Sequence, residues 1–116
     1  MNKPAILQEV GLRPVRVLIA EDSGDDLAIV LRALKRGGFQ VTHRCVQTAA
    51  DFSAALAADS WDAVLSDFNM PDFTGMDALR ILRATGLDIP FILISATIGE
   101  ETAVEAMKAG ASDYVM

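Results

Sequence analysis

The stretch VRVLIAED, residues 15–22, joins an apolar run to two acids, Glu21 and Asp22. The stretch AVLSD, residues 63–67, has the same form and ends on Asp67. Short apolar runs of this kind are typical of buried strands. If the two strands are neighbours in a parallel sheet, their three carboxylates converge at one edge. Because like charges held close together repel, such a cluster indicates a site for a hard divalent cation with oxygen ligands.

The overall composition limits the class of protein. The chain has 116 residues, of which 52% are hydrophobic, and this fits one domain with a real core. A net charge of -6 argues against nucleic-acid binding by this domain. Cys45 is the single cysteine, so we expect a small core residue and a cytoplasmic protein. We see no signal peptide and no apolar run of the roughly 20 residues that cross a membrane.

Apolar runs alternate with helix-period segments along the chain, which favours parallel strands joined by crossover helices. This alternation predicts an α/β fold with a doubly wound sheet of five parallel strands. We take the flavodoxin-like order 2-1-3-4-5, which is one of the common orders of such sheets. The ligand crevice of such a sheet lies between strands one and three. The predicted strands cover residues 15–20, 40–46, 62–66, 90–95 and 112–115.

Helix signals separate these strands. Helical spacing places four apolar residues on one face of a first helix: Leu27, Val30, Leu31 and Leu34. Thr48 and Asp51 form a capping-box pattern at the start of a second helix. A third helix begins near Gly75, where we expect glycine to supply a permissive backbone. A fourth begins at Glu100 and ends before Gly110.

No helix follows the strand predicted at residues 112–115, although a doubly wound sheet needs both faces covered. We therefore expect a domain over residues 14–116 that lacks the fifth helix, preceded by a tail over residues 1–13. This reading makes the chain a part of a longer protein. An uncovered apolar face also predicts self-association, as a homodimer through the face of strand five.

Four motifs follow one another in an informative order: Glu21-Asp22, SDFNMP at residues 66–71 with Gly75, Ser95-Ala96, and GASDY at residues 110–114. Together they resemble the receiver domain of two-component response regulators, over residues 15–116. The resemblance implies a flavodoxin-like sheet and a signalling switch. It also implies that the chain is no enzyme beyond its own phosphorylation and dephosphorylation.

The resemblance assigns roles to the acids. Asp67 would accept a phosphoryl group from a phosphohistidine of a histidine kinase. Mg²⁺ would be held by Glu21, Asp22, Asp67 and the main-chain carbonyl of Asn69. Glu21 stands where many receivers have a second aspartate, and a water-mediated contact tolerates the longer side chain. Read without the resemblance, Glu21 could instead be a solvated loop acid, which is the less favoured alternative.

The resemblance also assigns a conformational switch. The hydroxyl of Ser95 would turn toward the new phosphate, and the aromatic ring of Tyr114 would enter the space that it leaves. The surface of helix four and strand five would then change. As plain structural residues, Ser95 would hydrogen-bond the backbone and Tyr114 would be an ordinary half-buried side chain.

Receivers carry a lysine directly after the position of Met116, where this chain stops. We expect Mg²⁺ binding to survive without it, and phosphorylation to be slower and poorly coupled to the switch. The stretch at residues 95–101 resembles receivers attached to sensor kinases or signalling enzymes. The output domain, covalently attached or separate, would then lie outside this chain.

Two other functions remain open from the residues alone. One is a receiver-like protein-binding module without phosphotransfer. The other is a Mg²⁺-dependent phosphatase with an aspartyl nucleophile, although such enzymes need an acid where Asn69 stands. A nucleotide-binding domain is disfavoured, because no glycine-rich phosphate loop follows the first predicted strand.

Overall fold

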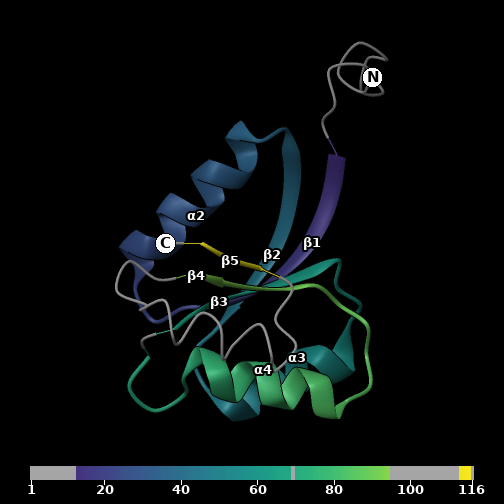
Figure 1. The fold of residues 1–116 in the computed structure, drawn as a ribbon. Helices are drawn as coiled ribbons and strands as arrows, with labels where there is room; N and C mark the ends of the chain where they lie inside the picture. Colours follow the sequence, from purple (N-terminus) through teal and green to yellow (C-terminus); the bar gives the residue numbers. More distant parts are fainter. Residues whose placement is uncertain (1–12, 69, 95–112, 116) are drawn as a thin grey trace.

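A five-stranded parallel sheet forms the centre of the molecule (Figure 1). The computed structural model describes residues 13–68, 70–94 and 113–115. Within them the strand order is β2-β1-β3-β4-β5, which confirms the predicted doubly wound topology. The strands are β1 (Arg13–Ala20), β2 (Phe39–Val46), β3 (Ala63–Asp67), β4 (Phe91–Ile94) and β5 (Asp113–Val115).

Helices cover both faces of this sheet. The described helices are α2 (Gly24–Arg36), α3 (Ala49–Ala58) and α4 (Gly75–Ala84). Helix α2 lies on one face, and α3 and α4 lie side by side on the other (Figure 1). The helix predicted to begin at Glu100 lies outside the described residues.

Alternation along β1 and β3 divides the core into two layers. Val17, Ile19 and Leu65 pack with the apolar face of α2. Leu18 and Val64 point the other way, into the larger cluster with α3 and α4. Successive side chains of a strand point to opposite faces, so both strands need apolar residues throughout. The predicted apolar face of α2, with Leu27, Val30, Leu31 and Leu34, is confirmed.

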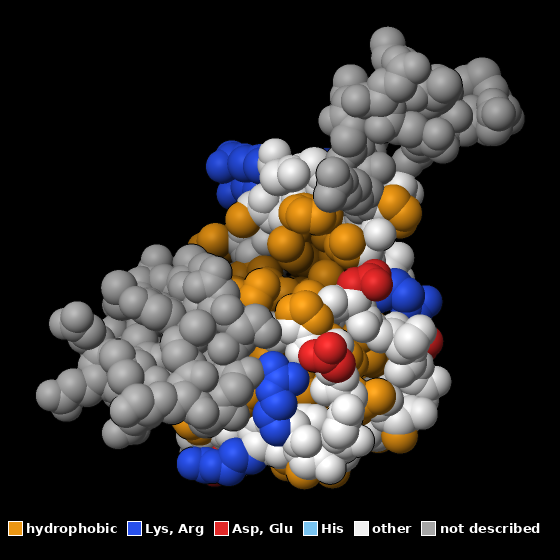
Figure 2. All heavy atoms as spheres, turned by 45° about the vertical axis from the view of Figure 1, so that its right-hand side comes forward, with side chains coloured by type: hydrophobic (Ala, Val, Ile, Leu, Met, Phe, Trp, Pro, Cys, Tyr) orange, Lys and Arg blue, Asp and Glu red, His pale blue; other side chains and the backbone are white. Residues whose placement is uncertain are grey.

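The α2 layer is the more open of the two. Several of its hydrophobic side chains are only partly buried, among them Val15, Ala63 and Ile92. Figure 2 shows a surface region in which hydrophobic side chains gather. The homodimer through the face of strand five stays a prediction.

Each described helix begins with a hydroxyl that caps its first turn. The main-chain N–H three residues on donates to the cap: Asp26 to Ser23 (3.3 Å), Asp51 to Thr48 (3.0 Å) and Asp77 to Thr74 (3.2 Å). The Asp77 carboxylate also accepts from the Thr74 N–H at 3.0 Å, which completes a capping box. A capping box was predicted for Thr48 and Asp51, and the structure shows one half of it, the bond to the Thr48 hydroxyl. The box at Thr74 was not predicted.

Arg16 stabilises the end of the sheet that lies opposite the acids. Its guanidinium pairs with Asp59 at 2.6 Å, and its Nε–H donates to the carbonyl of Ser60 at 3.0 Å. The same group lies 5.4 Å from the centre of the Trp61 ring. The indole N–H of Trp61 donates to the carbonyl of Ala55 at 3.0 Å. These contacts tie β1 to the loop between α3 and β3.

Replacing Arg16 by alanine should lower the free energy of unfolding by about 1 kcal/mol, because a cation–π contact and an ion pair are lost together. Arg80→Ala is the matched control. Arg80 pairs with Asp77 at 3.3 Å, but its side chain is 68% exposed, so little loss is expected. Urea unfolding followed by circular dichroism measures both variants. If Arg16→Ala and Arg80→Ala lower the free energy of unfolding equally, the contact of Arg16 with Trp61 adds nothing to stability.

Candidate functional site

Three carboxylates meet where β1 and β3 end. Glu21 and Asp22 follow β1, and Asp67 is the last residue of β3. The two strands are parallel neighbours, with Ala20 opposite Ser66. One carboxylate oxygen from each acid lies within 4.8 Å of the other two. The predicted convergence of Glu21, Asp22 and Asp67 is therefore observed.

Glu21 is the buried member of this cluster. The residue is 6% exposed, whereas Asp22 is exposed and Asp67 is partly buried. Its Oε2 accepts hydrogen bonds from the N–H groups of Asp22, at 3.0 Å, and Ser23, at 3.2 Å. The carboxylate thus lies inside the turn that leads into α2, which rules out a merely solvated loop acid.

The surroundings of Glu21 alter its acidity. Burial raises the pKa of Glu21 from 4.5 to about 7, and the negative charges of Asp67 and Asp26 act in the same direction. The hydrogen bonds from Ser23 and Asp22 lower the pKa and offset part of this rise. A group that resists ionisation next to two further acids is the electrostatic setting that a bound cation would relieve.

Strand β2 fixes the main chain of Glu21. The N–H of Glu21 donates to the carbonyl of Val46 at 3.1 Å. The thiol of Cys45 donates to the carbonyl of Glu21 at 3.3 Å. Cys45 is half-buried, and burial raises the pKa of its thiol. The prediction of a buried core residue was wrong: Cys45 belongs to neither core cluster of the described residues, and its thiol instead holds the acidic loop by a hydrogen bond.

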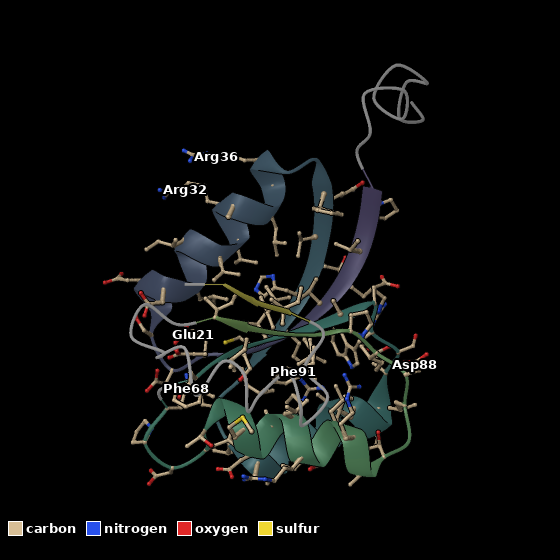
Figure 3. All side chains as sticks on the ribbon, in the orientation of Figure 1. Glu21, Arg32, Arg36, Phe68, Asp88 and Phe91 are labelled. Carbon is tan, nitrogen blue, oxygen red and sulfur yellow. The ribbon has the colours of Figure 1, made fainter. Side chains whose placement is uncertain are left out.

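Helix α4 fixes the main chain that follows Asp67. The N–H of Phe68 donates to the carbonyl of Ile94 at 3.1 Å, and the N–H of Gly75 donates to the carbonyl of Phe68 at 3.2 Å. Figure 3 shows Glu21 and Phe68 at the same edge of the molecule, with Phe68 near the start of α4. Strand β4 and the start of α4 therefore position the loop.

Gly75 is needed for space rather than for an unusual backbone angle. A Cβ here would lie 2.6 Å from Cδ1 of Leu93 and 2.9 Å from the carbonyl oxygen of Asp67. Among the described glycines, positive φ angles occur at Gly38 and Gly86 and not at Gly75. The prediction of a permissive backbone was wrong, because the constraint comes from the close packing of α4 against β3 and β4.

A pocket opens beside the exposed acid. It has a volume of about 320 Å³ and is lined by Asp22 together with residues 47–49 and 70–73. These residues belong to the loop after β2 and the loop after β3. Asp22, the exposed member of the acid cluster, therefore borders this pocket.

The donor set suits a hard cation. Carboxylate oxygens are the ligands that Mg²⁺ and Ca²⁺ prefer, and Mg²⁺ is usually bound by one or two carboxylates and several waters. Asp22 and Asp67 provide accessible oxygens, and Glu21 lies behind them. The residues present thus fit a magnesium site.

Three predicted site residues fall outside this description. Asn69 and Ser95 are not among the described residues. Tyr114 is described for its backbone, which lies in β5 opposite Leu93. Their assigned roles stay predictions. The structure adds one residue with no predicted role, Ser66, whose hydroxyl donates to the carbonyl of Asp67 at 3.0 Å.

The fold, the acid cluster and the sequence agree on one family. The chain belongs to the response regulator receiver domains, whose sequence profile matches residues 17–116. The transcriptional regulatory protein PrrA of Mycobacterium tuberculosis is 34% identical over 111 residues, covering 93% of this chain and 46% of PrrA. The sensory/regulatory protein RpfC of Xanthomonas campestris pv. campestris is 29% identical, covering 98% of this chain and 16% of RpfC. The chain thus spans less than half of these relatives.

Solved structures support the same fold. Full-length FixJ from B. japonicum matches with a TM-score of 0.72 and 29% identity, covering 86% of this chain and 48% of that one. The receiver domain of the sensor histidine kinase PA1611 from Pseudomonas aeruginosa matches with a TM-score of 0.69 and 25% identity, covering 87% and 83%. That crystal structure has a magnesium ion coordinated in the active site cleft.

Membrane insertion has no candidate segment in the described part of the chain. No helix there is both long and apolar enough to span a bilayer.

The raised pKa of Glu21 makes stability depend on pH in the metal-free protein. The folded state favours protonated Glu21, so its stabilising effect is complete below about pH 4.5 and is lost as the pH rises through about 7. Between pH 5 and 8 the free energy of unfolding should fall by about 2 kcal/mol through this group. Glu21→Gln should remove that fall.

Urea unfolding at several pH values, with a chelator present, measures this effect. Asp25→Asn, which alters an exposed acid in the first turn of α2, should keep the wild-type slope. If Glu21→Gln keeps the same slope as the wild type, Glu21 is ionised in the folded protein at neutral pH.

Proposed function

We propose that this receiver domain is a phosphoacceptor switch in which Asp67 takes a phosphoryl group from a histidine kinase. The observation that carries the proposal is the meeting of Glu21, Asp22 and Asp67 at the ends of β1 and β3. Asp67 is the most suitable nucleophile, because main-chain hydrogen bonds of Phe68 hold the chain directly after it and the residue is half-buried. No observation favours a phosphatase or a binding module without phosphotransfer.

The reaction is a group transfer between two side chains. A carboxylate oxygen of Asp67 attacks the phosphorus of the phosphohistidine, the P–N bond breaks, and the imidazole leaves with the electron pair. The product is an acyl phosphate on Asp67, which water later hydrolyses to inorganic phosphate. Because a carboxylate is a weak nucleophile, positioning and charge neutralisation supply most of the catalysis.

The chain's own residues provide the positioning. Asp22 and Asp67 would hold Mg²⁺ directly, Glu21 would hold it through water, and the carbonyl of Asn69 would complete the protein ligands. When bound, Mg²⁺ neutralises charge on the phosphoryl oxygens. The strand ends set the spacing of the acids before any ligand arrives, so little reorganisation is needed during the reaction.

The signal would leave the site through the far edge of the sheet. Ser95 would sense the phosphate, and Tyr114 would follow, changing the surface of the fourth predicted helix and strand five. A phosphoryl group adds charge and strong acceptor oxygens, which can bias an element with two states. We propose a cytoplasmic domain that acts on an output domain, attached or separate, and that turns over no other substrate.

Incubation with acetyl phosphate and Mg²⁺ should raise the intact mass of the chain by one phosphoryl group. Asp67→Asn should gain nothing, because an amide is not a competent nucleophile. Removal of Mg²⁺ by a chelator should also abolish the gain. Hydroxylamine should release the group, since it cleaves acyl phosphates. A gain that persists in Asp67→Asn, or that resists hydroxylamine, would place the phosphate elsewhere.

Calorimetric titration with Mg²⁺ tests the metal site separately. Asp22→Asn should weaken binding by about tenfold or more, because a charged oxygen ligand becomes a neutral amide. Asp25→Asn changes the net charge equally, yet lies outside the acid cluster, and should bind like the wild type. If both variants weaken binding equally, Mg²⁺ responds to the acidic surface and not to a defined site.

A further inference from the structure

The hydroxyl of Ser66 is hydrogen-bonded to the main chain of the proposed phosphoacceptor. Ser66 is the residue before Asp67 on β3, and its Oγ–H donates to the carbonyl oxygen of Asp67 at 3.0 Å. The carbonyl belongs to the peptide that joins Asp67 to Phe68. That peptide sets the direction in which the chain leaves the strand.

Burial makes this hydroxyl unusual. Ser66 is 0% exposed, and the buried polar or charged residues of the described part are Ser66 and Glu21. Both lie at the edge where the acids meet, while the rest of the core is apolar. A buried hydroxyl is costly unless it is hydrogen-bonded, and alanine would fill the same place without that cost. Packing alone therefore gives no reason for serine here.

The Asp67 carbonyl is confined from the other side by α4. A Cβ at Gly75 would lie 2.9 Å from this oxygen and 3.1 Å from Cα of Phe68, so the helix backbone passes very close to it. The N–H of Phe68 donates a hydrogen bond to the carbonyl of Ile94, and the carbonyl of Phe68 accepts one from the N–H of Gly75. These other contacts are made by backbone groups, whereas Ser66 holds the peptide with a side chain.

We infer that Ser66 is a positioning residue for the phosphoacceptor. Its hydroxyl fixes the orientation of the Asp67–Phe68 peptide. This peptide in turn sets the orientation of the Asp67 carboxylate and the direction of the chain toward Asn69. The inference rests on the proposed function of Asp67. Groups that orient metal ligands commonly alter metal affinity by about tenfold to a hundredfold when they are removed. A small rotation of this peptide would move both the nucleophile and the proposed carbonyl ligand.

Three variants of the full chain separate positioning from packing. Ser66→Ala removes one oxygen and leaves the rest of the strand unchanged. Ser66→Thr keeps the hydroxyl. Val64→Ala is the matched control, because Val64 is also 0% exposed and lies on the same face of β3 two residues earlier. It removes buried methyl groups and should lower overall stability without touching the Asp67 carbonyl.

Amide hydrogen exchange, measured by NMR on metal-free protein, is the first measurement. In Ser66→Ala the N–H of Phe68 should exchange about tenfold faster than in the wild type, while the N–H of Leu65 changes little. Ser66→Thr should restore slow exchange at Phe68. Val64→Ala should speed hydrogen exchange at the N–H groups of Leu65 and Phe68 to the same extent.

Calorimetric titration with Mg²⁺ is the second measurement. Ser66→Ala should bind about tenfold more weakly, and Ser66→Thr and Val64→Ala should bind like the wild type. Unchanged exchange at Phe68 in Ser66→Ala would overturn the inference, as would equal weakening of Mg²⁺ binding by Val64→Ala. If the wild type itself binds no Mg²⁺, the proposed metal site fails, and exchange at Phe68 still decides the role of Ser66.

Discussion

The parallel pairing of β1 with β3 is the constraint on which the rest of this domain depends. With Ala20 opposite Ser66, the residues that follow are forced to one edge of the sheet, and three carboxylates meet there. Their mutual repulsion opposes folding in the absence of a cation. The main chain at the site must therefore be held in place against this repulsion. The end of β2 holds Glu21, and the start of α4 holds the chain after Asp67.

Stability and chemistry are placed at opposite ends of the same strands. The contacts of Arg16 with Asp59, Ser60 and Trp61 join β1 to the segment before β3, at the end of the sheet far from the acids. Between the two ends the core is apolar on both faces. The repulsion among the acids is thus far from the contacts of Arg16, which stabilise the opposite end of the sheet.

Patterns local in the chain predicted the strands and the apolar face of α2. The convergence of the acids followed from these strands once the flavodoxin-like strand order was assumed. Features that depend on neighbours distant in the sequence were not predictable in the same way. The demand for glycine at position 75 comes from Leu93 and from the Asp67 carbonyl. The raised pKa of Glu21 comes from burial under folded neighbours. The Thr74–Asp77 capping box is different, because it depends only on the local spacing Thr-x-x-Asp, which a sequence can show.

The acidity of Glu21 has a consequence for the thermodynamics of ion uptake. A carboxyl group with a pKa of about 7 is partly protonated at neutral pH, and a cation nearby favours its ionised form. Cation uptake would then release part of a proton into the surrounding solution. The heat of binding would include the ionisation enthalpy of whatever buffer receives that proton, and it would differ between a buffer such as Tris and one such as phosphate at the same pH.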